Sequence, residues 1–204
     1  MRVMVAVLML FAVTMPAVAQ DRLPPIPADK QTPEQQKASE AFRANRKQDV
    51  FGPFVPLHRS PEVMLRAMAM GDFLRYRTVF PTRLNELIIL ITSRHFTQQY
   101  EWYVHQPIAL KEGLDRGVVD AIADGRRPSG MVPDEELIYE FCTELLRNNS
   151  VSDATYARAV QRFGEQGMIE MVGVVGYYTF QSMVLNTART PVPGGVLGLK
   201  PFPK

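Results

Sequence analysis

The sequence predicts an all-α, single-domain protein, and three features lead to this prediction. Apolar residues recur every three or four positions over long stretches, which is the spacing of one helical face. Residues that favour helix starts precede several of these stretches. No stretch of useful length alternates between apolar and polar residues, as a half-buried strand would.

Residues 1–19 have the features of a signal peptide. The stretch is nearly all apolar, Arg2 is its only charged residue, and it ends in Ala17-Val18-Ala19, a small-residue cleavage pattern. We expect cleavage before Gln20 and, in a bacterium, export to the periplasm. An uncleaved anchor is the alternative, but the apolar run is short for a span of about 20 residues and contains Pro16. We therefore expect no membrane association after cleavage.

The remaining 185 of the 204 residues are enough for one domain with a sizeable core. The formal net charge is +2 for the whole chain and +1 without Arg2. This balance gives no electrostatic reason to expect a nucleic acid partner. Cys142 is the only cysteine, so an internal disulfide is excluded. It lies in an apolar stretch, and we interpret it as a small core residue.

Residues 20–50 are interpreted as a proline-rich leader followed by a first helix. Residues 21–30 contain three prolines and should be extended. Thr32 can cap the helix, Pro33 is tolerated in its first turn, and Gln35 can complete a capping box.

A second helix should start at Ser60-Pro61, where similar residue types occur. Its expected core face consists of Val63, Ala67, Met70 and Leu74, which follow helical spacing. The next helix, about residues 82–96, is apolar on most sides and should be buried nearly all round. A helix over residues 97–111 contains Pro107, where we expect a kink.

Three further helices are predicted at residues 134–147, 153–163 and 166–188. The last of them has no charge from Met171 to Thr187, which is compatible with a membrane span. Its tyrosine, glutamine, serine and asparagine residues instead favour a central core helix. Residues 194–204 continue a segment rich in proline and glycine, and are predicted to be a flexible tail, either an arm or a disordered end.

Glu86 is the first candidate for chemistry. Its neighbours one turn later, Ile89 and Leu90, are apolar. A carboxylate on an apolar face needs a partner or stays protonated, and either condition suits an acid or base. The alternative is a structural ion pair, for example with Arg83 on the preceding turn.

Gln98, Glu101, Trp102 and His105 stand at i, i+3, i+4 and i+7 and therefore share one side of the next helix. An imidazole, a carboxylate, an amide and an indole ring together resemble the wall of a small-molecule site. Glu101 and His105 are one turn apart, so the carboxylate can hydrogen-bond the imidazole and raise its basicity. Ordinary surface polar residues at a helix start are the alternative. No further His or Asp lies at ligand spacing, so no metal site is expected.

These residues resemble the carboxymuconolactone decarboxylase family, which includes the alkylhydroperoxidase D proteins. The resemblance is carried by Ser60-Pro61-Glu62, Glu86, Tyr100-Glu101-Trp102, His105, Gly113, Val174, Gly176-Tyr177-Tyr178, Met183 and Leu185-Asn186. It covers about residues 52–193 and implies a helical domain over residues 51–193. The implied fold is an alkylhydroperoxidase D-like helical bundle, and the implied assembly is a homotrimer or a multiple of one.

The peroxidase branch of that family has Glu, then eleven residues, Cys, two residues, Cys, three residues and His. Here Glu86 and His105 stand at the ends of that spacing, but Gln98 and Glu101 occupy the two cysteine positions. A thiol peroxidase needs one thiolate to attack peroxide and a second thiol to resolve the product. We therefore do not expect thiol peroxidase activity from this chain alone.

The decarboxylase branch also lacks the cysteine pair, and its chemistry needs no cofactor. It requires an acid, a base and a cation for the substrate carboxylate. Our predicted catalytic residues are Glu86, His105 and Glu101, and our predicted substrate-binding residues are Gln98, Trp102 and Arg94, with Arg94 as the cation. We expect Glu86 and His105 to lie within hydrogen-bond distance or to be linked by one water, and to line a shared pocket. The leading hypothesis is a cofactor-free, decarboxylase-like lyase that acts on a small organic acid or lactone. The alternatives are a peroxide-handling protein that uses a partner thiol, and a non-catalytic oligomer that binds an apolar ligand.

Overall fold

The computed structural model describes residues 21–201, and this range contains helices and loops but no strand. The helices are η1 (Ala28–Lys30), α1 (Pro33–Arg46), α2 (Phe54–Leu57), α3 (Pro61–Tyr76), α4 (Thr82–His95), α5 (Gln99–Lys111), α6 (Arg116–Ala123), α7 (Pro133–Asn148), α8 (Asp153–Ala188) and η2 (Pro193–Gly195). The all-α prediction is confirmed for this range. The predicted signal peptide, residues 1–19, lies outside the described residues.

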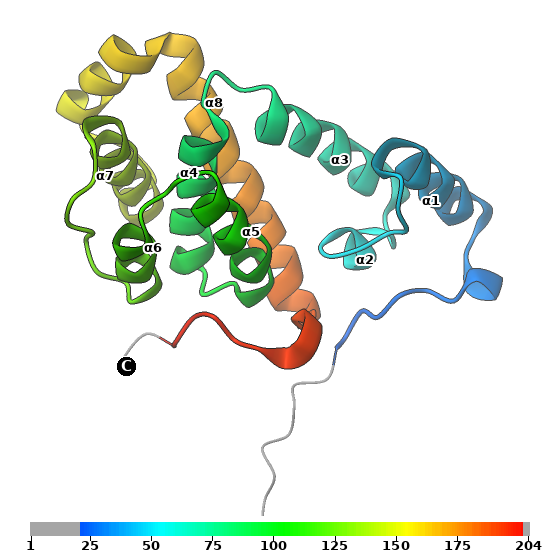
Figure 1. Ribbon diagram of the computed structural model, residues 1–204. Coiled ribbons are helices and arrows are strands. Elements are labelled where there is room, and N and C mark those ends of the chain that lie inside the picture. Colours follow the sequence, from blue (N-terminus) through cyan, green and yellow to red (C-terminus); the bar gives the residue numbers. More distant parts are fainter. Residues whose placement is uncertain (1–20, 202–204) are drawn as a thin grey trace, which may run out of the picture.

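Helices α4 to α8 form a bundle, and α1 to α3 extend from one side of it (Figure 1). We call residues 33–76, which contain α1 to α3, the arm. Inside the bundle, α4 contacts α5, α7 and α8, so it is the central helix. The arm is attached mainly through α3, which packs against α8.

The start of α1 has the predicted capping box. The backbone N–H of Gln35 donates to Thr32 Oγ1 at 3.3 Å, and the backbone N–H of Thr32 donates to Gln35 Oε1 at 3.0 Å. The predicted core face of α3 is only half right, because Val63 and Met70 are exposed. Helix α3 packs against both α1 and α8, so its buried face is rotated from the predicted one, and Met64 and Gly71 are buried in place of Val63 and Met70. The buried residues are Met64, Ala67, Met68, Gly71 and Leu74.

Helix α4 is buried on every side from residue 84 to residue 94, as predicted. Most of its polar side chains are satisfied by the backbone. The Asn85 amide donates to a carbonyl at the end of α3 at 2.9 Å. The hydroxyls of Thr92 and Ser93 donate to carbonyls of the preceding turn at 2.9 and 2.8 Å. Glu86 is an acceptor, so it needs a donor from another element.

Helix α8 is long, but Gly164 interrupts it with φ 71° and ψ 170°. The two predicted helices, residues 153–163 and 166–188, correspond to the parts on either side of this glycine. By length and composition alone α8 could cross a membrane, but half of its apolar window is buried inside the protein. Gln181 and Ser182 are also buried within it, which fits a core helix better than a lipid-facing one.

The described part of the C-terminal segment packs against α5. Gln99 Nε2 donates to the Leu199 carbonyl at 2.7 Å, and the Leu199 N–H donates to Gln99 Oε1 at 3.0 Å. The Leu199 side chain is buried. Arg94 Nη1 donates to the Lys200 carbonyl at 2.7 Å. Up to residue 201 the tail is therefore a packed segment, which is the first of its two predicted alternatives, and not a disordered end. Helix α5 itself continues through Pro107, where we expected a kink.

The contact between the arm and the bundle can be tested at Gly71 of α3. A Cβ atom there would overlap the hydroxyl of Tyr177 on α8. Gly71→Ala gains up to about 1 kcal/mol of helix propensity, but overpacking costs about 1–3 kcal/mol, so we expect net destabilisation. Met70→Ala, on the exposed side of the same helix, is the matched control. Urea unfolding at one fixed protein concentration should show that Gly71→Ala loses stability, whereas the control changes by no more than about 0.5 kcal/mol.

Candidate active site

The turn between α4 and α5 brings the candidate residues together. Thr97 has a positive φ of 47°, and Gln98 follows it as the N-cap of α5. The Gln98 side-chain oxygen accepts from the backbone N–H groups of Tyr100 and Glu101. Its Nε2 donates to Asn186 Oδ1 on α8 at 2.9 Å. This short, capped turn directs α5 back along α4, so the middle of α5 lies beside the first half of α4.

Glu86 of α4 and His105 of α5 form a buried pair. His105 Nδ1 lies 2.6 Å from Glu86 Oε2, and each side chain is only 3% exposed. The expectation that these residues lie within hydrogen-bond distance is confirmed. The alternative pair with Arg83 is wrong, because Arg83 forms its ion pair with Glu135 of α7.

The other ring nitrogen of His105 faces Glu101. His105 Nε2 lies 3.4 Å from Glu101 Oε2, which is longer than the about 2.7–2.9 Å of a charge-assisted hydrogen bond. Burial lowers the pKa of His105, but its interactions with the Glu101 and Glu86 carboxylates outweigh burial and raise the pKa above its ordinary value. The folded protein therefore favours the form of the ring that carries protons on both nitrogens.

A pocket of about 40 Å³ lies at the Glu101 side of His105, between the arm and the bundle. Glu101 and His105 line it, whereas Glu86 does not. The expectation that Glu86 and His105 line a shared pocket is therefore wrong, because the imidazole stands between Glu86 and the cavity. The volume has room for a few water molecules. A larger ligand would have to displace arm side chains that close the pocket, such as Phe51 and Phe54.

Two lining residues escaped the sequence analysis as candidates, Arg75 of α3 and Tyr178 of α8. Burial lowers the pKa of Arg75, but Tyr178 and the other acidic groups around it outweigh burial and raise the pKa. The Tyr178 ring meets the His105 ring edge-on, with 5.1 Å between centroids. Asn85, the neighbour of Glu86, donates to the Arg75 carbonyl at 3.3 Å and so fixes the end of α3 beside the site. A polar Asn85 in an apolar helix was the one sequence feature that could have indicated this contact.

None of the three predicted substrate-binding residues, Gln98, Trp102 and Arg94, lines this pocket. The Gln98 amide is used as a cap. Trp102 is fully buried and packs against the C-terminal segment, where a Cβ on Gly198 would lie 2.6 Å from Trp102 Cδ1. Arg94 lies eight residues after Glu86, which is a rotation of about 80° and a rise of about 12 Å along the helix. It lines a different pocket.

Thiol chemistry would need Cys142, and metal chemistry would need a cluster of ligand side chains. Cys142 is fully buried, and burial raises the pKa of its thiol far above the ordinary value, so it is not a reactive thiolate. Within residues 21–201 no group of three or more His, Cys, Asp or Glu side chains is arranged to hold a metal ion.

No family model and no curated protein matches the sequence. Solved structures do match over most of the chain. A peroxidase-related protein from Ralstonia eutropha JMP134, described as an alkylhydroperoxidase AhpD core, has 14% sequence identity and a TM-score of 0.67. The match covers 88% of this chain and 97% of that one. The chain has the AhpD fold.

Two further structures share the AhpD fold with this chain. The debrominase Bmp8, in complex with 2,3,4-tribromopyrrole, has 12% identity and a TM-score of 0.65, over 85% of this chain and 92% of its own. A peroxidase-related protein from Silicibacter sp. TM1040 has 14% identity and a TM-score of 0.64, over 86% and 93%. One AhpD fold thus carries proteins described by different chemistries, so the activity has to be argued from the residues at the site.

The raised pKa of His105 predicts a specific dependence of stability on pH. Its protonated form is favoured by folding, so the stabilisation is complete below the unfolded pKa of about 6.5 and is lost as pH rises through the higher folded pKa. His105→Gln should therefore remove a fall in the free energy of unfolding above about pH 6.5. Urea unfolding of both proteins from pH 5 to 9 measures this difference.

His95→Gln is the control for this experiment. Burial, together with the charge of Arg147, lowers the pKa of His95, so its contribution has the opposite sign. Removing His95 should remove a small gain in stability as pH rises toward about 6.5. A His105→Gln profile parallel to the unmodified protein would contradict the charged His105 pair.

Proposed function

We propose that this protein is a cofactor-free acid–base enzyme, with His105 as the acid and Glu101 as the base. The observation that carries the proposal is the position of the His105 ring. It stands between two buried carboxylates, and only its Nε2 side lies at the pocket with Glu101. An imidazolium beside a carboxylate can give a proton to a substrate and take one from it.

Glu86 has a different role from the one expected from the sequence. It accepts the Nδ1 proton of His105 and has no place on the pocket wall, so it is a positioning residue. The bond fixes the ring orientation and keeps Nε2–H directed at the Glu101 side. It also helps to hold His105 in the charged form that an acid requires.

We propose a small organic acid or lactone as the substrate, with Arg75 in place of Arg94 as the cation for its carboxylate. Arg75 lines the same pocket as His105 and Glu101. Its guanidinium suits a carboxylate, because it can donate two parallel hydrogen bonds. Once arm side chains such as Phe51 and Phe54 have moved aside, the aromatic and apolar residues of the pocket would surround the carbon skeleton of a small acid.

Decarboxylation is the reaction that these groups support best. The bond between the substrate carbon and its carboxylate breaks, carbon dioxide leaves, and the electron pair passes into the enolate of a neighbouring carbonyl. His105 Nε2–H then supplies the proton that ends on the carbon. Glu101 then acts as the base: it takes a proton from water and returns it to Nε2, and the hydroxide that is left combines with carbon dioxide as bicarbonate.

Two other functions compete with this proposal. A thiol peroxidase would fit the descriptions of two of the structural matches, but Cys142 is the only cysteine of the chain and is fully buried. Peroxide chemistry would therefore require a thiol from a partner. A non-catalytic ligand-binding protein would use the same pocket without a proton transfer. We also propose, from residues 1–19, that the enzyme is exported to the periplasm.

The acid–base proposal predicts how three variants behave with a panel of small organic acids and lactones that includes carboxymuconolactone. Carbon dioxide release should fall by about 10²–10⁴-fold in His105→Gln and in Glu101→Gln. The double variant should lose much less than the product of the two effects, because the groups act as a unit. Glu86→Gln should move the alkaline limb of the pH–rate profile to lower pH, since it weakens the support for the charged ring.

Phe73→Ala is the matched control, because Phe73 is on the same helix as Arg75 but is exposed and does not line the pocket. Its rate and pH profile should be unchanged. Melting temperatures and acid binding should be measured on all variants. Full turnover by Glu101→Gln, or binding of acids that is retained with no turnover in the unmodified protein, would favour the ligand-binding alternative.

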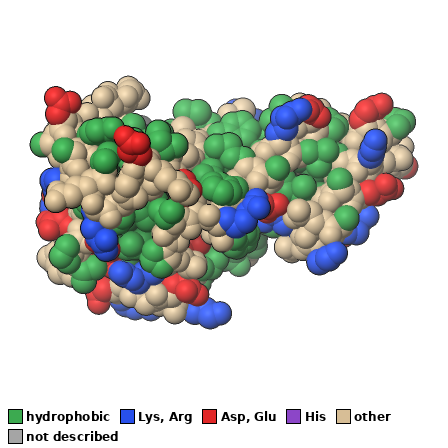
Figure 2. Space-filling view, turned by 90° about the horizontal axis from the view of Figure 1, so that it is seen from above, with side chains coloured by type: hydrophobic (Ala, Val, Ile, Leu, Met, Phe, Trp, Pro, Cys, Tyr) green, Lys and Arg blue, Asp and Glu red, His purple; other side chains and the backbone are tan. Residues whose placement is uncertain are grey.

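We further propose that copies of the chain associate through α8. Ile169, Val172, Gly176, Phe180 and Met183 lie at helical spacing on one exposed stripe. No charged residue interrupts α8 from residue 171 to residue 187. Figure 2 shows one face of the molecule, on which hydrophobic side chains are exposed among charged ones. Exposed apolar stripes of this kind support association with other subunits.

The assembly proposal predicts a homotrimer, or a multiple of one. Met183→Glu should lower the mass measured by light scattering at micromolar concentration, because it places a charge in the apolar stripe. Tyr156→Glu is the control, since Tyr156 is equally exposed but precedes the Gly164 break in α8. An unmodified protein that is monomeric at this concentration would refute the proposal.

A further inference from the structure

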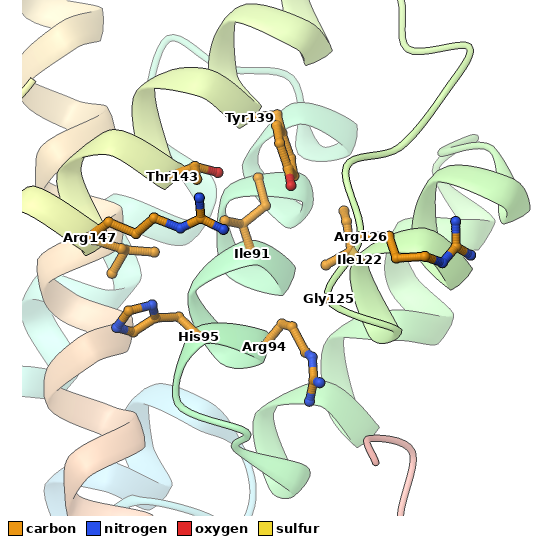
Figure 3. A pocket seen from close by; sticks show the side chains of 10 residues that line it. Ile91, Arg94, His95, Ile122, Gly125, Arg126, Tyr139, Thr143 and Arg147 are labelled. Carbon is orange, nitrogen blue, oxygen red and sulfur yellow. The ribbon is translucent and has the colours of Figure 1, made fainter. Parts of the chain in front are cut away.

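A second pocket, of about 90 Å³, lies at the opposite end of α4 from the Glu86–His105 pair (Figure 3). It is formed by the last turn of α4, the loop after α6 and the second half of α7. Three apolar side chains form part of its wall: Ile91, Ile122 and Leu146. None of its lining residues is acidic, although three of them are arginines.

The arginines of this pocket have different partners. Arg126 donates to Asp124 Oδ2 at 3.0 Å, and Arg94 donates to the carbonyl of Lys200. Arg147 instead extends from α7 toward Ile91 (Figure 3). Among residues 21–201, no acceptor lies within hydrogen-bond distance of the Arg147 guanidinium. Arg147 is exposed, and the donors of its guanidinium are therefore available to a ligand at the mouth of the pocket.

Polar groups beside Arg147 could complete an anion site. Thr143 stands one turn earlier on α7, and within the described range its hydroxyl has no hydrogen-bond partner. His95 of α4 faces the same cavity. Burial and the nearby Arg147 charge lower the pKa of His95, so at neutral pH it is an uncharged imidazole. Arg147 thus has two neutral polar side chains, Thr143 and His95, beside it in the pocket.

Helix capping does not account for the cation. The last carbonyls of α4 and α6 already accept hydrogen bonds from backbone N–H groups of the turns that follow them. These bonds are Thr97 N to Arg94 O at 2.9 Å, Gln98 N to Ser93 O at 2.8 Å, Gly125 N to Ile122 O at 2.9 Å and Arg126 N to Ala121 O at 2.9 Å. The Arg147 charge is therefore not needed to satisfy these helix ends.

We propose that this pocket binds a small apolar carboxylate, with its headgroup at Arg147 and Thr143 and its carbon chain against Ile91, Ile122 and Leu146. The Arg147 guanidinium matches a planar carboxylate, to which it can donate two parallel hydrogen bonds. A dry cavity of about 150 Å³ holds benzene, so about 90 Å³ suits a chain of a few carbons. This site is separate from the acid–base pocket and does not depend on the proposed reaction.

Butyrate is the probe for this site, and an NMR titration of the purified protein is the measurement. Butyrate should shift the backbone amides of Gly125 and Arg126, which line the pocket, in a saturable manner. Arg147→Gln should weaken this binding about tenfold, as expected for the loss of one charge-assisted hydrogen bond. Arg116→Gln, an exposed arginine at the start of α6, should bind as the unmodified protein does.

Three comparisons make the test decisive. 1-Butanol has the same carbon chain without the charge, and equal binding of the alcohol would overturn the anion site. Inorganic phosphate that shifts Gly125 and Arg126 when butyrate does not would overturn the carboxylate class. Butyrate binding that is lost in Arg75→Gln but kept in Arg147→Gln would assign the ligand to the acid–base pocket and overturn the proposal. Absence of saturable shifts at tens of millimolar butyrate would do the same.

Discussion

Glu86 is a carboxylate placed on a helix that is buried on every side, and this constraint shapes the whole site. Its polar neighbours on α4, such as Asn85 and Thr92, donate to backbone carbonyls. A carboxylate has no proton to donate, so it needs a donor from outside the helix. His105 supplies one because the short turn at Thr97 and Gln98 directs α5 back along α4. The hairpin of α4 and α5 therefore also supplies the partner that the buried Glu86 carboxylate needs.

The buried Glu86 carboxylate positions His105, and a different carboxylate, Glu101, lies where a ligand would bind. Because Glu86 occupies Nδ1 of the imidazole, only the Nε2 side remains for the pocket, where Glu101 lies. At the two positions that correspond to the cysteines of the thiol branch of the resembled family, this chain has Gln98 and Glu101. Gln98 is a buried cap that ties the turn to Asn186 of α8, and Glu101 is a pocket carboxylate. The proposed proton-transfer site thus occupies the place where a thiol pair would stand.

Spacing within one helix or across one tight turn could be predicted from the sequence, and this was enough to find Glu86, Glu101 and His105. The direction in which each side chain leaves its helix could not be predicted as finely. Glu101 and Trp102 are adjacent and differ by about 100° around the axis, so one faces the pocket and the other the C-terminal segment. Arg75 escaped because it comes from α3, and no local pattern states which separate helices meet. The burial of α4 was predictable because its apolar residues cover every side.

His105 and His95 lie in different surroundings near α4, and their pKa values shift in opposite directions for this reason. His105 lies between carboxylates, which raise its pKa, whereas burial and Arg147 lower the pKa of His95. The two histidines are separated by apolar residues of the buried helix, such as Leu87 and Ile91. These shifts favour the charged form of His105 and the neutral form of His95. Each form suits the proposed site, since the acid–base pocket needs a proton donor beside Glu101 and the Arg147 guanidinium supplies the cation for a carboxylate.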